Sequence, residues 1–152
     1  MCVFLDLEAT GLSVQTDEVI ELGAVARSLG PDGGWSSSGA NGSEFEDFRV
    51  LVKPSSVRLS PTVAKLTGLL SSQLQREGIA FHEAMLMWLD WLRRALAAAA
   101  VARLWLFAHN GFDYDFPLLL ACEARGRPEG KAASTGKVGG VSTMPLSQPW
   151  KP

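Results

Sequence analysis

Apolar residues gather in four short stretches that are typical of β-strands. Residues 2–8 and 19–26 are apolar apart from isolated acids and one glycine, and residues 45–52 mostly alternate between apolar and polar. Residues 104–108 are continuously apolar, as expected of an interior strand. We therefore predict four strands at these positions. The Gly- and Ser-rich segment 29–43 is expected to be a flexible loop.

Helical patterns lie between the third and fourth strands. Ser60 and Pro61 form a helix-start signal, with Ser60 as the N-cap, and Gly68 ends this short helix. Another short helix is expected over 71–78. A longer amphipathic helix follows, because its apolar residues recur at spacings of three and four: Phe81, Met85, Trp88, Leu92 and Ala95.

The order of these elements predicts an α/β domain. The chain has 152 residues, which is enough for one domain with a buried core. We place this domain at 1–125. From 126 onward the chain is rich in Gly and Pro and has no apolar period, so 126–152 is predicted to be a disordered tail.

Composition and charge limit the classes of function. The net charge is −2, so any affinity for nucleic acid must come from local features of the surface. The two cysteines, Cys2 and Cys122, make no disulfide framework, and the N-terminus has no signal-peptide pattern. An intracellular protein of the nucleus or cytoplasm is expected. The longest uncharged apolar run, 95–102, is too short to span a bilayer, so no membrane partner is predicted.

Asp6 and Glu8 are the first candidates for chemistry. They lie at the end of the first predicted strand, and residues two apart on a strand point to the same face. Two neighbouring carboxylates repel one another unless they share a proton or a cation. Oxygen ligands suit Mg²⁺ or Mn²⁺, so this pair predicts a divalent metal site.

A second candidate segment follows the strand at 104–108. Residues 109–111 form a turn signal, and a helical pattern then runs to about residue 125. Asp113 is the expected N-cap of this helix, which places Asp115 in its first turn. A carboxylate there, near the end of the strand, is expected to reach the same metal site.

Three segments of the chain carry a family resemblance. They are Phe-Leu-Asp-Leu-Glu-Ala-Thr-Gly-Leu at 4–12, Leu-Thr-Gly-Leu at 66–69 and Ala-His-Asn-Gly-Phe-Asp-Tyr-Asp-Phe-Pro-Leu-Leu at 108–119. In this order they resemble the first two exonuclease motifs of the DEDDh 3′→5′ exonucleases. Within that superfamily their sequences most resemble those of the three-prime repair exonucleases, which degrade DNA from its 3′ end. The resemblance implies an α/β, ribonuclease H-like fold with a mixed central sheet that is incomplete at the C-terminus. It implies an antiparallel meander of the first three strands, a fourth strand parallel to the first, and helices on both faces.

The resemblance also implies the residues of the site. Asp6, Glu8 and Asp115 would be catalytic residues and ligands of Mg²⁺ or Mn²⁺. Contacts to single-stranded DNA or to a DNA 3′ end are expected from six further positions: Ala9, Thr10, Leu12, Leu66, Asn110 and Tyr114. Three of these, Leu12, Leu66 and Tyr114, equally fit core positions. The resembled enzymes are homodimers that pair through their third strand, so a homodimer or heterodimer through 45–52 is expected.

The chain departs from the family after its second motif. The family's third motif supplies a histidine general base and a fourth metal-binding aspartate. This chain has two histidines: His109 lies inside the second motif, and His82 precedes it. The acids after Asp115 are Glu123 and Glu129. Two functions stay open: a metal-dependent 3′→5′ DNA exonuclease with impaired activity, or a non-catalytic remnant that binds nucleic acid or dimerises and so modulates a full-length relative.

A different enzyme class also fits one segment. Asp6-Leu7-Glu8-Ala9-Thr10 superficially resembles the aspartyl phosphotransferase loop of haloacid dehalogenase-like phosphatases. That loop normally has aspartate at the second acidic position, and the class needs a downstream lysine and a late acidic pair. The late pair is missing, and the segment at 108–119 has no place in that scheme. The exonuclease interpretation is therefore preferred.

Overall fold

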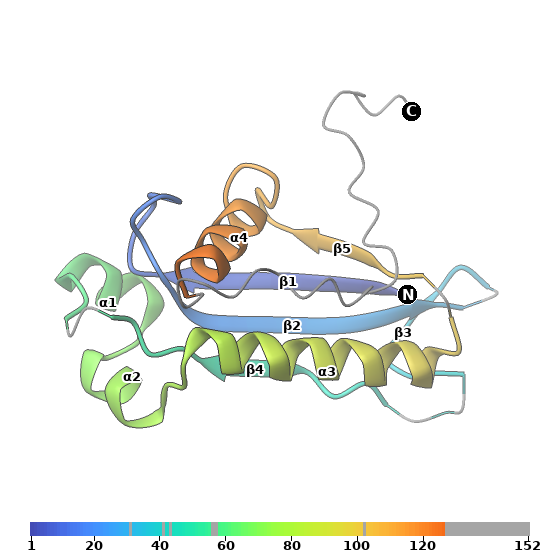
Figure 1. The fold of residues 1–152 in the computed structure, drawn as a ribbon. Helices are drawn as coiled ribbons and strands as arrows, with labels where there is room; N and C mark the ends of the chain where they lie inside the picture. The colour runs from blue at the N-terminus through green and yellow to red at the C-terminus, as the bar shows by residue number, and fades with distance from the viewer. Residues whose placement is uncertain (31, 41, 43, 56–57, 102, 127–152) are drawn as a thin grey trace.

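The structure, a computed structural model, describes residues 1–126 except 31, 41, 43, 56–57 and 102. Its strands and helices follow one another in an α/β order (Figure 1): β1 Cys2–Ala9, β2 Val19–Leu29, β3 Trp35–Ser36, β4 Phe48–Leu51, α1 Pro61–Thr67, α2 Ser71–Glu77, α3 Phe81–Ala99, β5 Trp105–Ala108 and α4 Asp115–Gly126. The predicted tail, apart from its first residue, lies outside the described residues.

One mixed sheet organises the described part of the chain. β1 pairs antiparallel with β2 and parallel with β5, and β2 pairs antiparallel with β4 through Glu21–Ala24. The predicted meander and the parallel strand are therefore confirmed. In the register of these pairs Asp6 lies opposite Gly23, Glu8 lies opposite Glu21, and Leu5 is the partner of Ala108. β1 and β5 thus end at the same edge of the sheet.

The third predicted strand is shorter than 45–52: β4 covers only Phe48–Leu51, although Val52 still donates its amide to the carbonyl of Ile20 on β2 at 2.9 Å. Phe45 donates its amide to the carbonyl of Ser37 at 2.6 Å, outside the main ladder. Val52 forms an isolated parallel bridge with Ile79. The predicted loop 29–43 also contains a short strand, β3, whose Trp35 pairs with Leu29 at the end of β2. This pairing was not predicted, because only two residues take part in it.

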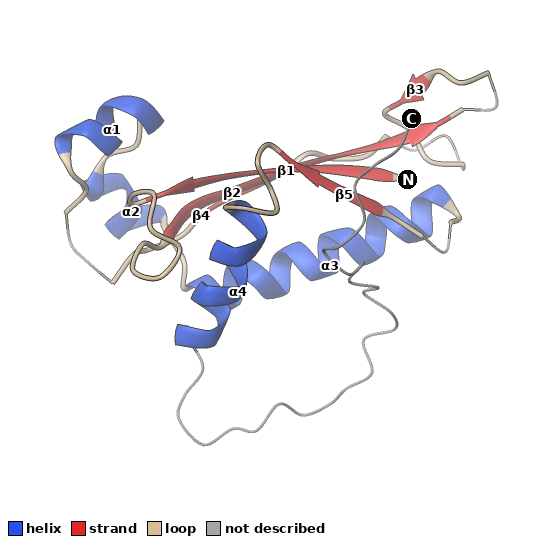
Figure 2. Ribbon diagram, turned by 90° about the horizontal axis from the view of Figure 1, so that it is seen from above, coloured by secondary structure: helices blue, strands red, loops and turns tan. Residues whose placement is uncertain are grey.

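The main core lies on one face of the sheet. Val3, Leu5 and Leu7 are buried and alternate with outward-facing residues of β1, as a half-buried strand requires. α3 and α4 pack on this face, and Figure 2 shows both helices on the same side of the sheet. The predicted stripe of α3 is confirmed, because all five of its residues are buried in this core or pack against it.

The opposite face of β1 and β5 carries aromatic side chains. Phe4 stacks on Phe107 with ring centroids 5.3 Å apart and meets Trp35 edge-on at 6.1 Å. Trp105, two residues before Phe107, is exposed as well. Helices were expected on both faces, yet among the described residues the two long helices cover only one, and this aromatic face stays exposed.

The short helices α1 and α2 lie at the end of the sheet where β1 ends (Figure 1). Ser60 caps α1 as predicted, since its side chain accepts the amide of Val63 at 3.2 Å. Gly68 closes α1 in the left-handed region, with φ of 71°. A second small core holds this end together through Ile20, Leu69 and Leu74.

Candidate metal and nucleotide site

Asp6 and Glu8 project from the same face of β1, as predicted from their spacing. They alternate with the buried residues Leu5 and Leu7, so both carboxylates point away from the main core. Burial raises the pKa of Glu8, and the negative charges of Asp6 and Glu21 raise it further. Asp6 and Glu8 are thus close enough to disfavour their joint ionisation.

Asp115 reaches the same cluster from the other side of the β1–β5 pair. It is the first residue of α4 and only 5% of its surface is exposed. Burial raises the pKa of Asp115, and the charge of Asp6 adds to this rise, while the helix amide and His109 oppose it. Asp6 therefore influences the pKa of both other predicted carboxylates, and we call this group of interacting acids the acidic cluster.

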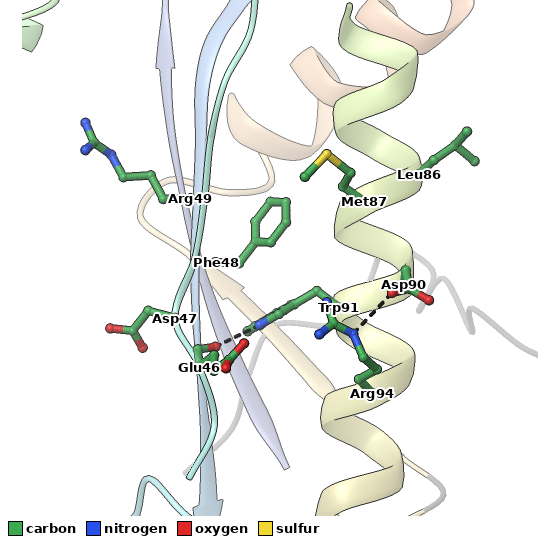
Figure 3. A pocket seen from close by; sticks show the side chains of 9 residues that line it. All are labelled: Glu46, Asp47, Phe48, Arg49, Leu86, Met87, Asp90, Trp91 and Arg94. Carbon is green, nitrogen blue, oxygen red and sulfur yellow. Dashed lines mark hydrogen bonds and ion pairs between the residues drawn. The ribbon is translucent and has the colours of Figure 1, made fainter. Parts of the chain in front are cut away.

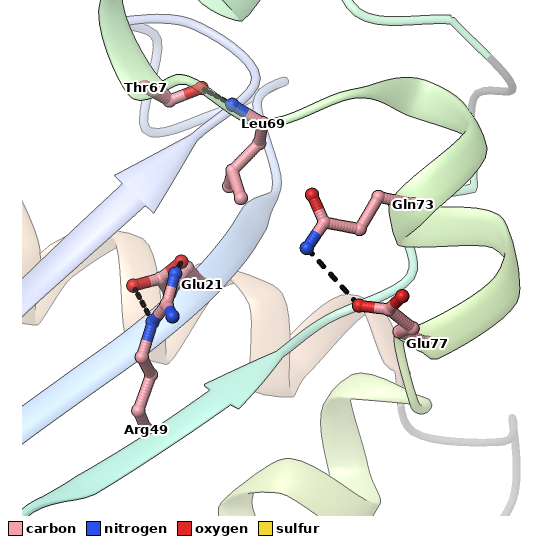
Figure 4. A network of polar contacts seen from close by, with 6 residues as sticks. All are labelled: Glu21, Arg49, Thr67, Leu69, Gln73 and Glu77. Carbon is pink, nitrogen blue, oxygen red and sulfur yellow. Dashed lines mark hydrogen bonds and ion pairs between the residues drawn. The ribbon is translucent and has the colours of Figure 1, made fainter.

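The cluster contains a further acid that sequence reasoning did not assign to it. Glu21 lies opposite Glu8 on β2 and adds to its negative surroundings. Arg49 on β4 binds Glu21 through two parallel hydrogen bonds of 2.7 and 2.8 Å (Figure 4). The arginine therefore pairs with Glu21, whereas among the described residues no salt bridge joins Asp6, Glu8 or Asp115 to a basic side chain. The signal for Glu21 was its cross-strand register, which needs the pairing of β1 and β2.

The donor chemistry of these acids fits a hard divalent cation, because all the ligand atoms are carboxylate oxygens. Within the described ranges, however, no three His, Cys, Asp or Glu side chains are already arranged to hold a metal ion. The acids share an electrostatic environment but not a closed coordination sphere.

The turn before α4 differs from the prediction at its helix cap. The carbonyl of Asn110 accepts the amides of Asp113 and Tyr114 at 3.1 and 3.0 Å, so the turn extends through Tyr114. The carbonyl of Tyr114 then accepts the amide of Leu118 at 2.9 Å, the first bond of α4. The prediction that Asp113 caps the helix is therefore wrong, although Asp115 does lie in its first turn. Asn110 adopts a left-handed conformation, with φ of 55°, and its side chain is exposed.

Gly111 explains how this turn fits beside the sheet. A Cβ atom at this position would lie 2.9 Å from the Cβ of Ala108 and 2.9 Å from the ring of Phe116. The absence of a side chain therefore lets the turn pack tightly between the end of β5 and the start of α4. This close approach brings Asp115 toward the end of β1.

The predicted nucleotide-contacting residues differ in their surroundings. Leu12 and Leu66 are exposed over 89% and 80% of their surfaces, so neither is a core residue in the described structure. Thr10 and Tyr114 bond to the loop that follows β1: the Thr10 hydroxyl donates to Asp17 at 2.8 Å, and the Tyr114 hydroxyl donates to the Gly11 carbonyl. Ala9 ends β1, at a register shift opposite Val19.

The two histidines occupy different places. His109 is exposed in the turn before α4, close enough to Asp115 to affect its pKa. His82 lies on α3, with its Nδ1 atom 4.0 Å from Glu123 Oε2. This contact supports a structural position for His82, away from the acidic cluster.

Two hollows lie along β4, one on each face of the sheet. The larger, about 530 Å³, lies between β4 and α3 and is lined by acidic, basic and apolar residues (Figure 3): Glu46, Asp47, Phe48, Arg49, Leu86, Met87, Asp90, Trp91 and Arg94. The smaller, about 320 Å³, is an open groove whose lining includes Asp6, Glu21 and Arg49. Asp6 and Glu21 of the acidic cluster therefore border the smaller groove, whereas Glu8 and Asp115 do not line it.

Comparison with known proteins now decides the family. The family model described as RNase_T: Exonuclease matches residues 3–116, a range that contains all three acids. The chain belongs to this exonuclease family. Human three prime repair exonuclease 2 is 37% identical over 123 residues, which cover 78% of this chain and 50% of that protein. The chain thus spans about half the length of this curated relative.

Solved exonuclease structures share the fold of the chain. The nuclease domain of 3′hExo, a DEDDh family member bound to rAMP, has a TM-score of 0.58 at 20% identity, covering 82% of this chain and 58% of that chain. E. coli exonuclease I in complex with a dT13 oligonucleotide has a TM-score of 0.54 at 14% identity, covering 82% and 23%. The predicted DEDDh resemblance and the ribonuclease H-like fold class are confirmed, and the phosphatase alternative gains no support.

No helix among the described residues is long and apolar enough to cross a membrane.

Proposed function

We propose that this chain carries the first part of a divalent-metal-dependent 3′→5′ exonuclease site for DNA, of the three-prime repair type. The observation that supports this most strongly is the position of Asp6, whose charge raises the pKa of both Glu8 and Asp115. Acids from two separate segments of the chain thus influence one another, at an electrostatic cost to the ionised forms of Glu8 and Asp115. A bound cation removes this cost, because it attracts all three carboxylates.

Mg²⁺ or Mn²⁺ bound by Asp6, Glu8 and Asp115 would supply Lewis-acid chemistry, polarising a phosphate and acidifying a water molecule. The residues themselves set the geometry. Asp115 is fixed by its burial at the start of α4, whereas Asp6 is exposed on β1 and accessible to a ligand. Asp6 is therefore the carboxylate with room to move toward a cation.

The apolar residues at the same end of the sheet suit a nucleotide. Leu12 follows β1 and Leu66 lies on α1, which is at the end of the sheet where β1 ends (Figure 1). Both are almost fully exposed, and covering an exposed leucine with a flat base stabilises the complex because apolar surface is removed from water. The preference for DNA 3′ ends is supported by the name of the human relative and by the oligonucleotide bound to E. coli exonuclease I.

We expect the activity of this chain alone to be low. After Asp115 the sequence contains no histidine, and its two later acids are Glu123 and Glu129. A general base at the third motif position typically contributes about 10²–10⁴-fold to the rate. With that base missing, the acids are expected to bind metal and the DNA end with little hydrolysis.

A nuclease assay tests this proposal. Single-stranded DNA labelled at its 5′ end is incubated with the protein and Mn²⁺ or Mg²⁺, and shortening from the 3′ end is followed on a gel. The expected result is slow, stepwise shortening that Asp6→Ala abolishes and the matched control Asp113→Ala retains. Shortening that survives Asp6→Ala, or a product pattern of internal cuts, contradicts the proposal.

A non-catalytic, dimerising role is the second candidate, and one surface favours it. Among the described strands β4 pairs only with β2. Its other edge is bonded at Leu51, whose carbonyl accepts the amide of Ile79 at 3.0 Å, and the rest of this edge has no strand partner beside the 530 Å³ hollow. Leu86 and Met87 of α3 are half exposed at this hollow (Figure 3). An open edge with apolar residues beside it is suited to pairing with a second copy or with a longer relative.

Sedimentation tests the dimer. The wild-type chain should sediment as a dimer, and Met87→Asp should shift it to a monomer at the same concentration. The exposed Leu120→Asp on α4 serves as the matched control and should leave the dimer intact. A wild-type monomer at all concentrations would exclude this role.

A further inference from the structure

The loop between β1 and β2 is closed by the carboxylate of Asp17. One oxygen of Asp17 accepts the hydroxyl of Thr10 at 2.8 Å, and the other accepts the amide of Ser13 at 2.7 Å. The Thr10 hydroxyl in turn accepts the amide of Glu18 at 3.0 Å. A Cβ atom on Gly11 would lie 2.5 Å from the Asp17 carboxylate, so a larger residue at this position would push the carboxylate from its place.

Arg125, near the end of α4, holds the same loop from outside. Its Nη1 atom donates to the carbonyls of Val14 and Gln15 at 3.2 and 2.8 Å, and its Nη2 atom donates to the carbonyl of Asp17. A guanidinium offers several donors in one rigid plane, which suits a row of backbone carbonyls. Three carbonyls of one loop are therefore fixed by one side chain.

Tyr114 provides a second attachment. Its hydroxyl donates to the carbonyl of Gly11, and its pKa is raised by burial and then by the charges of Asp17 and Asp115. The phenol therefore lies between the loop and the acidic cluster. The loop is thus bound at both ends to α4 and its preceding turn, the same helix that begins with Asp115.

Leu12 is the exposed apolar residue of this loop. It lies between the points where Asp17 closes the loop, and 89% of its surface is exposed. Both of its neighbours are hydrogen-bonded: the carbonyl of Gly11 accepts the hydroxyl of Tyr114, and the amide of Ser13 donates to Asp17. A ligand that covers an apolar residue in an already fixed loop has to order little of the backbone.

We propose that Arg125 and Asp17 are positioning residues, which fix the Thr10–Asp17 loop to α4 so that Leu12 lies ready against the terminal base of a DNA strand. This inference rests on the proposed function, since it concerns how the same site recognises a 3′ end. Arg125 then couples the position of the loop to that of α4, the helix that begins with Asp115. Neither residue is one of the three acids assigned to the metal.

Binding to linear and circular DNA tests the inference. Fluorescence anisotropy measures the affinity of each variant for a linear single strand and for a circular strand of the same sequence, with Ca²⁺ replacing the catalytic metal. The wild type should prefer the linear strand, because only that strand has a 3′ end. Arg125→Ala should lower the linear affinity at least fivefold and remove the preference, with circular binding unchanged. Arg125→Lys should retain part of the linear affinity and of the preference for the linear strand.

Matched controls separate positioning from general damage. Arg93→Ala removes the same charge from the exposed face of α3 and should behave as the wild type. Hydrogen exchange should rise in Arg125→Ala and in Asp17→Asn over residues 10–18, with the exchange of β2 unchanged. Affinity for Mn²⁺ should stay within twofold in both variants.

The outcomes distinguish the two proposals. A wild type that shows no preference for the linear strand overturns the proposed function and this inference with it. A wild-type preference that survives in Arg125→Ala and Asp17→Asn overturns only the positioning role. Faster exchange in the loop without any loss of end preference also overturns only the positioning role, because the loop would then be structural alone.

Discussion

The charge of Asp6 on β1 raises the pKa of Asp115, although the two residues belong to opposite ends of the described chain. The parallel pairing of β1 with β5 explains this proximity, because Leu5, next to Asp6, is paired with Ala108 at the end of β5. The tight turn around Gly111 then delivers Asp115 to the same edge. The acidic cluster is therefore a direct product of sheet topology.

The raised pKa of Asp115 predicts how stability depends on pH. The folded protein binds this proton more tightly than the unfolded chain, whose pKa is near the ordinary value of 3.8. Stability is therefore lost as the pH rises from that value through the folded-state pKa, and stays lower above it. In EDTA at pH 7, Asp115→Asn should be more stable than the wild type, and this difference should vanish as the pH falls below the ordinary value.

Urea denaturation across this pH range measures the effect. Asp113→Asn is the matched control, because Asp113 is exposed two residues away in the same turn. The control should follow the wild-type curve. An Asp115→Asn variant that is less stable than the wild type at pH 7 in EDTA would show that the carboxylate has a stabilising partner.

Two tryptophans of α3 allow a paired test of the core. Trp91 donates its indole N–H to the carbonyl of Glu46 at 2.8 Å, whereas the buried N–H of Trp88 has no partner among the described residues. Trp91→Phe leaves a carbonyl unpaired and should lower the free energy of unfolding by about 1–3 kcal/mol more than Trp88→Phe. Urea unfolding of both variants measures this difference. Equal losses would mean that packing, and not the hydrogen bond, determines the role of Trp91.

The segment 127–152 should contribute little to stability, because its sequence has no apolar period. Deleting it should change the melting temperature by less than about 2 °C. Limited proteolysis of the full chain should remove this segment first. Its protection from protease, or a large fall in melting temperature on deletion, would show that it packs on the domain.

The elements of the fold were largely predictable from local patterns. A single period in the sequence predicts the alternation in β1 and the apolar stripe of α3, and a single side-chain hydrogen bond predicts the cap formed by Ser60. All three are found as expected. The short strand β3 was missed, because Trp35 joins the sheet through a contact with Leu29 that no local period marks. The start of α4 was misplaced, because the carbonyl of Asn110 extends the turn by bonds that side-chain preferences do not reveal.

The three acids of the candidate site were proposed from the sequence, and their assignment as metal ligands stays a prediction, whereas their surroundings could not be predicted. Asp6 and Glu8 were recognisable because one motif places them at the end of a strand, and Asp115 because a second motif places it in the helix that follows another strand. The influence of Glu21 and its neutralisation by Arg49 depend on the register of β1, β2 and β4. Long-range contacts of this kind, including those of Arg125 with the loop, require the tertiary structure.

Mn²⁺ binding tests whether Asp6, Glu8 and Asp115 form one metal site. Electron paramagnetic resonance measures free Mn²⁺ during titration of the wild type, Asp6→Ala, Asp115→Asn and the control Asp113→Asn. The wild type and the control should bind Mn²⁺ with the same affinity, and each of the other two variants should bind at least about tenfold more weakly, a loss of about 1.4 kcal/mol. Equal Mn²⁺ affinity in the wild type, Asp6→Ala and Asp115→Asn would contradict the account.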